Sequence, residues 1–249
     1  MSLGDDQLDR YARHIILPEI GGSGQLRLLQ SHVALVGAGG IGSPAIQYLA
    51  AAGVGRLTII DDDVVSLSNL QRQTLYSTRD VGAHKVAMAA NVVARLNRDV
   101  QIHPVSRRLD AANADLVLRG ADVVIDGSDS FATRLLVADA CQWLQIPLVS
   151  AAVGRFEGQL AVYRGWEAGL PCYRCLVGED PARDETSCAD QGVLGALTGV
   201  IGSLAAMEAI RQLVPFGEDS AGRLLLFDAL AFRMRTIALA KDPGCRCAA

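Results

Sequence analysis

The sequence predicts an α/β fold with a Rossmann-like mixed sheet. We expect this sheet to be mainly parallel in the N-terminal half, to have antiparallel strands in the C-terminal half, and to carry helices on both faces. Over the first 155 residues, short apolar runs alternate with stretches of helical length, which is the pattern of a parallel sheet. A glycine-rich motif directly follows the first apolar run, and from about residue 156 the alternation changes.

The composition is typical of a compact globular protein. The chain has 249 residues, of which 50% are hydrophobic and 20% charged, with a net charge of -4. Disorder is excluded by this apolar content, and the lack of a basic excess predicts no nucleic-acid partner. The N-terminus has neither the basic start nor the apolar run of a secretory signal. The longest apolar stretch, 193–207, is too short to span a membrane, so we expect a cytoplasmic protein with no membrane partner.

Five apolar runs in the N-terminal half have the length and the β-branched content of buried strands. Between them lie stretches of helical length, the first of which is rich in alanine and ends at Gly53, a residue suited to a helix C-cap. Pro44 fits this helix only in its first turn. The expected strands are 32–36, 56–61, 100–105, 122–126 and 147–152, and the expected helices are 43–52, 82–97, 111–119 and 131–144.

The C-terminal half contains three strand-like runs, 159–163, 223–227 and 233–240, and one long helix at about 192–213. We expect these strands to extend the same sheet in antiparallel fashion. Since no linker is apparent, the sequence predicts a single domain over 1–249, with a nucleotide-binding half at about 1–155 and a second half at about 156–249. Small residues on the long helix, Gly192, Gly195, Gly199 and Gly202, indicate a close backbone approach, either within the subunit or at a dimer interface.

The glycine-rich motif predicts a nucleotide site. It contains Gly37, Gly39, Gly40 and Gly42, fits G-x-G-x-x-G, and is followed 19 residues after Gly42 by Asp61 at the end of the second expected strand. These features match the dinucleotide-binding fingerprint. Glycines let phosphates approach the backbone, the helix N-terminus favours negative charge, and Asp61 offers an acceptor to ribose hydroxyls. The alternative is a tight turn without a ligand, and the motif does not separate NAD from ATP.

The polar residues after the second strand favour ATP. Asp63, Asn69 and Arg72 follow it closely, and Lys85 lies near the start of the next expected helix. Cations are needed where negative charge develops on phosphates as pyrophosphate leaves, whereas hydride transfer does not require them. For Arg72 and Lys85 the alternative is solvated surface.

A second polar cluster, Ser128-Asp129, follows the strand 122–126 at the edge where ligands of open α/β sheets bind. Asp129 is suited to hold Mg²⁺ through its carboxylate. Its alternative role is the N-cap of the helix 131–144, and the two roles are compatible.

Several ordered motifs resemble the MoeB/ThiF (HesA) family, the enzymes that activate ubiquitin-like sulfur carriers. The match runs from about residue 8 to 247. It is carried by Arg10-Tyr11-Ala12-Arg13-His14-Ile15-Ile16-Leu17, Gly37-Ala38-Gly39-Gly40-Ile41-Gly42, Ala52-Gly53-Val54-Gly55, Ser66-Leu67-Ser68-Asn69-Leu70-Gln71-Arg72-Gln73, Val81-Gly82 followed by Lys85, and Cys172-Tyr173-Arg174-Cys175. Where the family has Thr-Asp-Asn, this chain has Ser128-Asp129-Ser130, which keeps the aspartate and a helix-capping side chain.

The resemblance implies an ATP-dependent adenylyltransferase. Such an enzyme joins the C-terminal Gly-Gly carboxylate of a small carrier protein to AMP and releases pyrophosphate, and a sulfur donor of the cysteine desulfurase or rhodanese type acts later. The run 61–69 is closer to the molybdopterin branch than to the thiamin branch. By motif, Asp61 binds ribose, Asn69, Arg72 and Lys85 bind phosphates with Ser128 nearby, and Asp129 positions Mg²⁺. Arg13 resembles an arginine that a second subunit donates, which implies a homodimer; the alternative is a surface residue.

The six cysteines are expected to be thiols or metal ligands in this setting. Cys172 and Cys175 have the spacing of half a tetrahedral zinc site. The other half is Cys245 and Cys247, a C-x-C one residue shorter than the family's C-x-x-C, so structural Zn²⁺ competes with ordinary thiols. Cys188 aligns with a family cysteine that links to the carrier in the thiamin branch; its alternative is an exposed thiol. We expect Cys141 to lie in the core.

Two alternative functions remain open at this point. An NAD(P)-dependent Rossmann oxidoreductase would explain the glycine motif, but it leaves Arg72, Lys85 and the cysteine pairs without a role. A non-catalytic scaffold predicts the loss of Arg72, Lys85 or Asp129, and all three are present.

Overall fold

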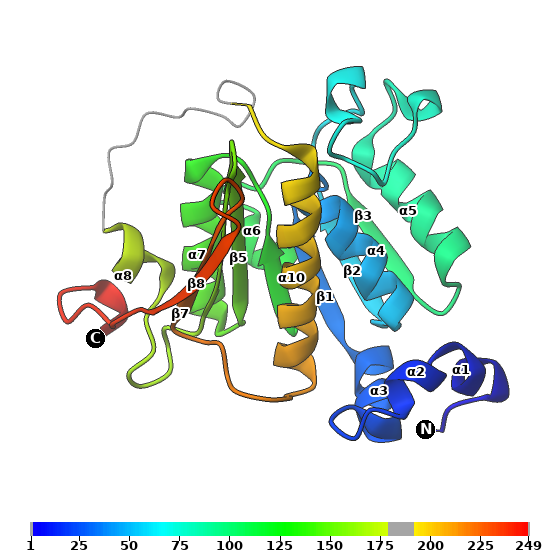
Figure 1. Cartoon of the computed structure of the whole chain (residues 1–249), viewed down its shortest axis with the longest axis horizontal. Coiled ribbons are helices and arrows are strands. Elements are labelled where there is room, and N and C mark those ends of the chain that lie inside the picture. The colour runs from blue at the N-terminus through cyan, green and yellow to red at the C-terminus, as the bar shows by residue number, and fades with distance from the viewer. Residues whose placement is uncertain (1, 179–191, 249) are drawn as a thin grey trace.

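The computed structural model describes residues 2–178 and 192–248 and contains one eight-stranded mixed sheet (Figure 1). Its order is β3-β2-β1-β4-β5-β6-β7-β8. The first five are parallel neighbours, and the last three join in antiparallel fashion, so the predicted fold class and every predicted strand are confirmed. The strands are β1 (His32–Val36), β2 (Arg56–Ile60), β3 (Gln101–Val105), β4 (Val123–Asp126), β5 (Leu148–Gly154), β6 (Glu157–Tyr163), β7 (Arg223–Asp228) and β8 (Arg233–Ala238).

The predicted helices are also present, and three of them start later than predicted, the long helix at residue 195 rather than at about 192. Gly82 has a φ of 89°, His84 bridges Val64, and the Lys85 N–H donates to Asp63 O, so α5 begins at residue 85 rather than 82. At α6, the Asp110 carboxylate accepts from the N–H groups of residues 112 and 113, and this local turn delays the helix. The helices are α1 (Asp5–Arg10), α2 (Ala12–Ile15), α3 (Gly21–Gln30), α4 (Gly42–Ala52), α5 (Lys85–Leu96), α6 (Ala114–Leu118), α7 (Phe131–Leu144), α8 (Tyr173–Val177) and α10 (Gly195–Leu213), with short 3-10 turns η1 (Leu67–Asn69), η2 (Thr78–Asp80) and η3 (Arg246–Ala248).

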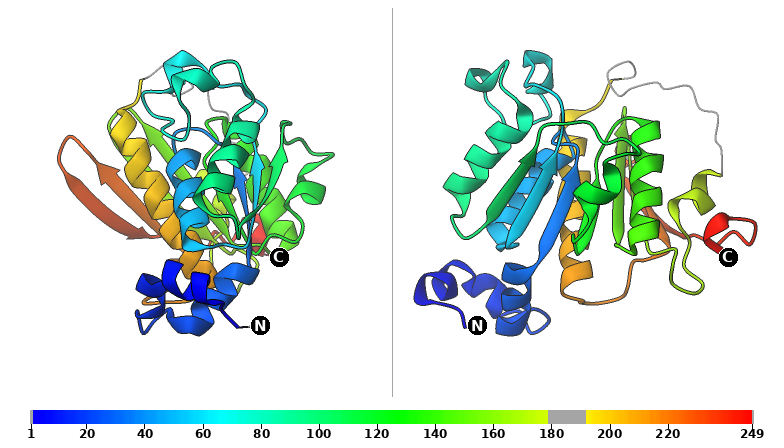
Figure 2. Two further views of the ribbon diagram at one scale, coloured as in Figure 1. Left: turned by 90° about the vertical axis from the view of Figure 1, so that its right-hand side faces the viewer. Right: turned by 180° about the vertical axis from the view of Figure 1, so that it is seen from behind.

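Helices cover both faces of the sheet. α4, α5 and α10 pack on one face, whereas α6 and α7 pack on the other (Figures 1 and 2). Val33 and Leu35 of β1 belong to the first core, while Ala34 and Val36 belong to the second. Burial on both faces explains why the parallel strands are continuous apolar runs. Among the described residues, no helix combines the length and the apolar character needed to cross a lipid bilayer.

The glycines of α10 serve packing within the subunit. A Cβ on Gly195 would lie 2.2 Å from Gln71 O, and one on Gly202 would lie 2.3 Å from Ile41 O. Gly199 would meet nothing within 4 Å. For Gly195 and Gly202, the choice left open by the sequence is therefore settled in favour of close contacts with the nucleotide-binding half.

The edge of the sheet that β8 forms is open to solvent. All six residues of β8 are exposed, and the β7–β8 hairpin is the outermost part of the sheet in the left panel of Figure 2. Phe232, at the turn of this hairpin, is 90% exposed. Within the described ranges, β7 is the strand that pairs with β8, and no second strand does.

Candidate functional site

A pocket lies at the carboxyl ends of the parallel strands, where open α/β sheets bind ligands. Segments that follow four neighbouring strands line it. They are 37–41 after β1, 61–63 after β2, 107–109 after β3 and 127–130 after β4, together with Arg72, Gln73, Lys85, Thr133, Arg134, Val153, Val193 and Thr198.

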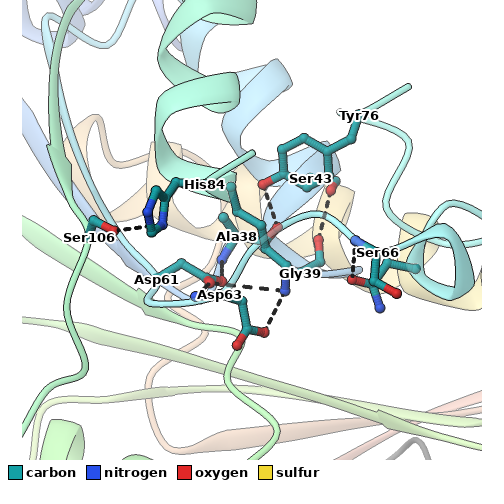
Figure 3. A network of polar contacts seen from close by, with 11 residues as sticks. Ala38, Gly39, Ser43, Asp61, Asp63, Ser66, Tyr76, His84 and Ser106 are labelled. Carbon is teal, nitrogen blue, oxygen red and sulfur yellow. Dashed lines mark hydrogen bonds and ion pairs between the residues drawn. The ribbon is translucent and has the colours of Figure 1, made fainter. Parts of the chain in front are cut away.

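The glycine loop 37–41 is held in place by hydrogen bonds to its carbonyl groups. Tyr76 Oη donates to Ala38 O at 2.8 Å, and Ser43 Oγ donates to Gly39 O at 2.7 Å (Figure 3). A Cβ on Gly42 would lie 2.1 Å from Gly37 O, so this glycine closes the loop and does not itself line the pocket. The N-terminus of α4 follows directly, which makes the loop a suitable place for phosphate.

Asp61 fixes the end of β2 to the glycine loop. Its Oδ2 accepts from the Ala38 N–H at 2.8 Å, and its Oδ1 accepts from the Asp63 N–H at 2.9 Å (Figure 3). Burial raises the pKa of this carboxyl, and the Lys85 ammonium and the two backbone donors oppose the shift only in part. Each oxygen keeps a free lone pair for a further donor such as a ribose hydroxyl.

Lys85 is buried, with an exposed fraction of 4%, so the surface alternative for this residue is wrong. Its Nζ lies 2.7 Å from Asp63 Oδ2 and 4.0 Å from Asp61 Oδ1. The carboxylates of Asp61, Asp62 and Asp63 lie within 4.8 Å of one another. Because Lys85 already compensates two of them, this acidic group is a poor choice for a divalent cation.

Arg72 lines the pocket and is half-buried, so it too is more than a solvated side chain. Its Nη1 donates to Ser68 O at 3.2 Å, and its carbonyl accepts from Thr198 Oγ1 at 3.3 Å. Asn69 is not among the lining residues; its Oδ1 accepts from the Ser66 N–H at 3.3 Å in a local turn. The predicted phosphate contact of Asn69 therefore stays a prediction.

The segment after β4 places Asp129 at the pocket. Ser130 Oγ accepts from the Thr133 N–H at 3.4 Å and caps α7. The alternative in which Asp129 is the cap is therefore wrong, and its exposed carboxylate is left at the pocket. Ser128 lines the pocket as well, and the Arg134 guanidinium donates to its carbonyl at 2.6 and 3.1 Å.

Among the lining residues that were not predicted as site residues are one amide and three guanidinium groups, those of Gln73, Arg107, Arg108 and Arg134. The two neighbouring arginines follow β3, which pairs with β2, so the carboxyl-edge rule applied to Asp61 would also have identified them. Together with Arg72 and Lys85, the pocket gathers five cationic side chains. Such a set suits a polyphosphate.

Two further predicted residues are not among those that the structure places at the pocket. Arg13 is exposed on α2, and α1–α3 lie at the amino end of β1, away from the pocket (Figure 1). Within one chain Arg13 is therefore not part of the site. Cys188 lies outside the described residues.

The C-x-x-C and the C-x-C meet in one cluster. The Sγ–Sγ distances are 3.8 Å for Cys172–Cys175, 3.5 Å for Cys172–Cys245 and 3.4 Å for Cys175–Cys247, and all four atoms lie within 4.8 Å of one another. Ligands about 2.3 Å from a tetrahedral zinc are separated by about 3.8 Å. The shorter C-x-C spacing thus still forms a four-thiol set. Cys141 is buried in the core, as predicted.

The sequence matches the ThiF family over residues 11–247. The chain belongs to the ThiF family. It is 49% identical to the "SAMP-activating enzyme E1" of Haloferax volcanii over 98% of this chain and 90% of that protein. It is 46% identical to the "Sulfur carrier protein adenylyltransferase" of Thermus thermophilus over 96% of this chain and 90% of that protein.

A longer relative shows the same identity over part of its length. The "Adenylyltransferase and sulfurtransferase MOCS3" of Bos taurus is 49% identical over 98% of this chain, which spans only 54% of that protein. Among solved structures, E. coli MccB superposes with a TM-score of 0.82 at 19% identity over 96% of this chain and 74% of that one. PaaA gives 0.78 at 22% identity over 97% and 76%; both likenesses show the fold.

The raised pKa of Asp61 predicts a pH dependence of nucleoside binding. As the pH falls through this pKa, the carboxylate is protonated and loses acceptor capacity for ribose hydroxyls. We expect the affinity for adenosine, which carries no titrating phosphate, to fall about tenfold to hundredfold. The fall should begin at a higher pH than an exposed aspartate would give, and calorimetric titration over a pH series measures it. In the control variant Asp61→Asn the affinity should be low at every pH; a wild-type affinity independent of pH contradicts the assignment.

Proposed function

We propose that this protein is an ATP-dependent adenylyltransferase that activates the C-terminal Gly-Gly carboxylate of a small ubiquitin-like sulfur-carrier protein. The observation that carries the proposal is the cation-rich pocket around the glycine loop. It is found in a ThiF-family chain whose relatives at 46–49% identity are named as adenylyltransferases or as an activating enzyme. These names speak against the oxidoreductase alternative.

In the proposed reaction, a carrier carboxylate oxygen bonds to the α-phosphorus of ATP. The bond from that phosphorus to the oxygen bridging the β-phosphate breaks, and pyrophosphate leaves with the electron pair. The nucleophile belongs to the carrier, so the enzyme's task is alignment and stabilisation of charge. We assign Asp61 to the ribose, the loop 37–41 and the N-terminus of α4 to phosphate, and Lys85, Arg72 and Asn69 to the developing negative charge.

We assign Mg²⁺ to Asp129, whose carboxylate is exposed at the pocket. The other acidic group is already occupied by the Lys85 ammonium, which supports this choice. When bound, Mg²⁺ neutralises the departing pyrophosphate. Ser128 precedes Asp129 and lines the same wall of the pocket.

For the pathway, we propose the molybdopterin branch over the thiamin branch, because the run 61–69 is closer to the molybdopterin pattern. The persulfide sulfur of a donor of the cysteine desulfurase or rhodanese type would displace AMP from the acyl-adenylate, and a second thiol would then reduce the resulting acyl disulfide to the thiocarboxylate. We place this reaction in the cytoplasm, where the four-cysteine set stays reduced. Adenylation itself does not require Cys188, whose link to the carrier remains a prediction.

We propose a homodimer in which Arg13 completes the partner's site. Near α2, an apolar groove is formed with α4 and α10, and Leu17, Tyr48 and Met207 are 41–58% exposed in it. A two-fold contact through this face is self-complementary. We propose a two-fold axis perpendicular to the strands, which would bring the amino end of one sheet, with Arg13, toward the carboxyl end of the other.

We further propose that Cys172, Cys175, Cys245 and Cys247 hold a structural Zn²⁺. Their sulfur separations of 3.4–3.8 Å support this assignment. None of the four lines the nucleotide pocket, so the metal would act on stability and not on the chemistry. It would join residues 73 positions apart in sequence.

ATP–pyrophosphate exchange tests the proposed reaction. Wild-type protein should catalyse exchange with a molybdopterin-type carrier ending in Gly-Gly, and a thiamin-type carrier tests the branch. Arg72→Ala should lower the rate about 10²–10³-fold through lost charge stabilisation, and Asp129→Ala should abolish it. Arg79→Ala, an exposed arginine of η2 outside the pocket, is the matched control and should behave as wild type. Absence of exchange with any carrier, in protein that binds Mg·ATP, would refute the proposed function.

Mixing of two inactive variants tests whether Arg13 is donated to the partner's site. Arg13→Ala and Arg72→Ala homodimers should each be inactive, since every site lacks one arginine. After subunit exchange in an equal mixture, about half of the dimers are heterodimers with one complete site, so about a quarter of the wild-type exchange activity should return. No recovery on mixing, or full activity of Arg13→Ala alone, excludes donation by the partner.

Metal content and unfolding free energy test the proposed zinc site. We expect about one Zn²⁺ per chain by elemental analysis, and its loss in Cys245→Ser. Zinc bound to both Cys172 and Cys245 would close the stretch of chain between them, as a disulfide would. Without this link, the unfolding free energy of the variant should fall by about 4 kcal/mol. Mg·ATP affinity should persist below the new melting temperature. Cys141→Ala is the control and should keep its zinc; equal zinc content in Cys245→Ser would contradict the assignment.

A further inference from the structure

Gln73 brings an unsatisfied amide to the pocket. The residue is 3% exposed and lines the pocket beside the glycine loop. Its Oε1 is buried and has no hydrogen-bond partner among the described residues. A buried acceptor without a partner is unfavourable, so this amide is arranged for a group that residues 2–178 and 192–248 do not supply.

The backbone fixes where this amide lies. The Gln73 N–H donates to Asn69 O at 2.9 Å, and Gln73 O accepts from the Tyr76 N–H at 3.2 Å. A Cβ on Gly39 would lie 3.7 Å from Gln73 Nε2, whereas a Cβ on Gly40 would lie 2.9 Å from the Thr198 side chain. Gln73 therefore sits where the glycine loop meets the first turn of α10.

This location discriminates among the parts of the proposed substrates. Phosphate oxygens only accept hydrogen bonds, so they could satisfy Nε2 but not Oε1. The edge of adenine offers a donor and an acceptor to a glutamine. However, the proposed function puts the phosphates on the glycine loop, and Gln73 Nε2 lies 3.7 Å from the Cβ position of Gly39 in that loop, so we place Gln73 beside the phosphates and not beside the base. A peptide chain end also offers both groups, a backbone N–H beside a carboxylate.

We propose that Gln73 Oε1 accepts a hydrogen bond from the backbone N–H of the carrier's terminal glycine and thereby aims its carboxylate at the α-phosphorus. The assignment rests on the proposed function and adds a residue that binds the peptide rather than the nucleotide. It also defines a specificity: the last residue must carry an N–H, so a terminal proline or N-methylated residue is rejected.

The test removes this hydrogen bond from either side. A carrier that supports exchange is prepared by ligation with a terminal Gly-Gly or Gly-sarcosine; sarcosine differs by one methyl group on the nitrogen. With wild-type protein, sarcosine should lower kcat/KM in ATP–pyrophosphate exchange at least about tenfold. In Gln73→Leu, kcat/KM should be low for both carriers and nearly equal, while the affinity for Mg·ATP stays within about twofold of wild type.

Two further variants guard against a general loss of structure. Gln73→Glu keeps an acceptor oxygen and should retain the discrimination against sarcosine, even if its carboxylate slows the reaction beside phosphate. Gln101→Leu makes the same change at an exposed glutamine of β3 and should match wild type in every measurement.

Three outcomes would overturn the inference. An equal sarcosine penalty in wild type and Gln73→Leu would show that the N–H is not read by Gln73. A large loss of Mg·ATP affinity in Gln73→Leu would assign the amide to the nucleotide. If wild-type protein binds Mg·ATP but no carrier supports ATP–pyrophosphate exchange, the proposed function is wrong, and this inference fails with it. In the first two outcomes the proposed function survives.

Discussion

The pocket depends on a buried ammonium group held between carboxylates. Lys85 is the first residue of α5, and its Nζ contacts Asp63 and approaches Asp61. Asp61 in turn accepts from the Ala38 N–H in the glycine loop. One charge cluster thus fixes the ends of β1 and β2 and the start of α5 relative to one another. Because a buried charge is tolerated only when it is compensated, these elements cannot move apart independently.

The same arrangement makes the site a product of both halves of the chain. The Thr198 hydroxyl on α10 makes its shorter hydrogen bond to Gly195 O at 2.7 Å and lies 3.3 Å from Arg72 O, and its side chain fills the space beside Gly40. Gly195 and Gly202 let α10 approach residues 71 and 41 closely. The nucleotide-binding half therefore does not form the pocket alone, because the long helix of the C-terminal half supplies Thr198 to its lining.

The sequence was sufficient where a residue's role follows from local pattern. The apolar runs predicted all eight strands, and the G-x-G-x-x-G with Asp61 predicted the pocket at their carboxyl ends, because both signals lie within about 30 residues of chain. It was insufficient where the decisive partner is distant. The burial of Lys85 follows from its pairing with Asp63, and the choice of Ser130 over Asp129 as helix cap depends on the backbone path after β4. Arg107 and Arg108 carry no motif; they enter the pocket because β3 pairs with β2.

The exposed edge of the sheet has a consequence for the behaviour of the protein in concentrated solution. In the part of the chain that the structure describes, β8 is the last strand of the sheet, and its outer row of backbone groups pairs with no other strand. Such an edge can template the addition of a strand from another molecule. Arg233 and Arg235 are two positions apart in β8, so their side chains lie on the same face of the strand. Two copies that approach edge to edge therefore bring positive charges together. Because these charges are exposed, dissolved salt screens their repulsion over about 10 Å at 0.1 M. Higher ionic strength therefore favours edge-to-edge association of two copies through β8, and low ionic strength keeps the copies apart.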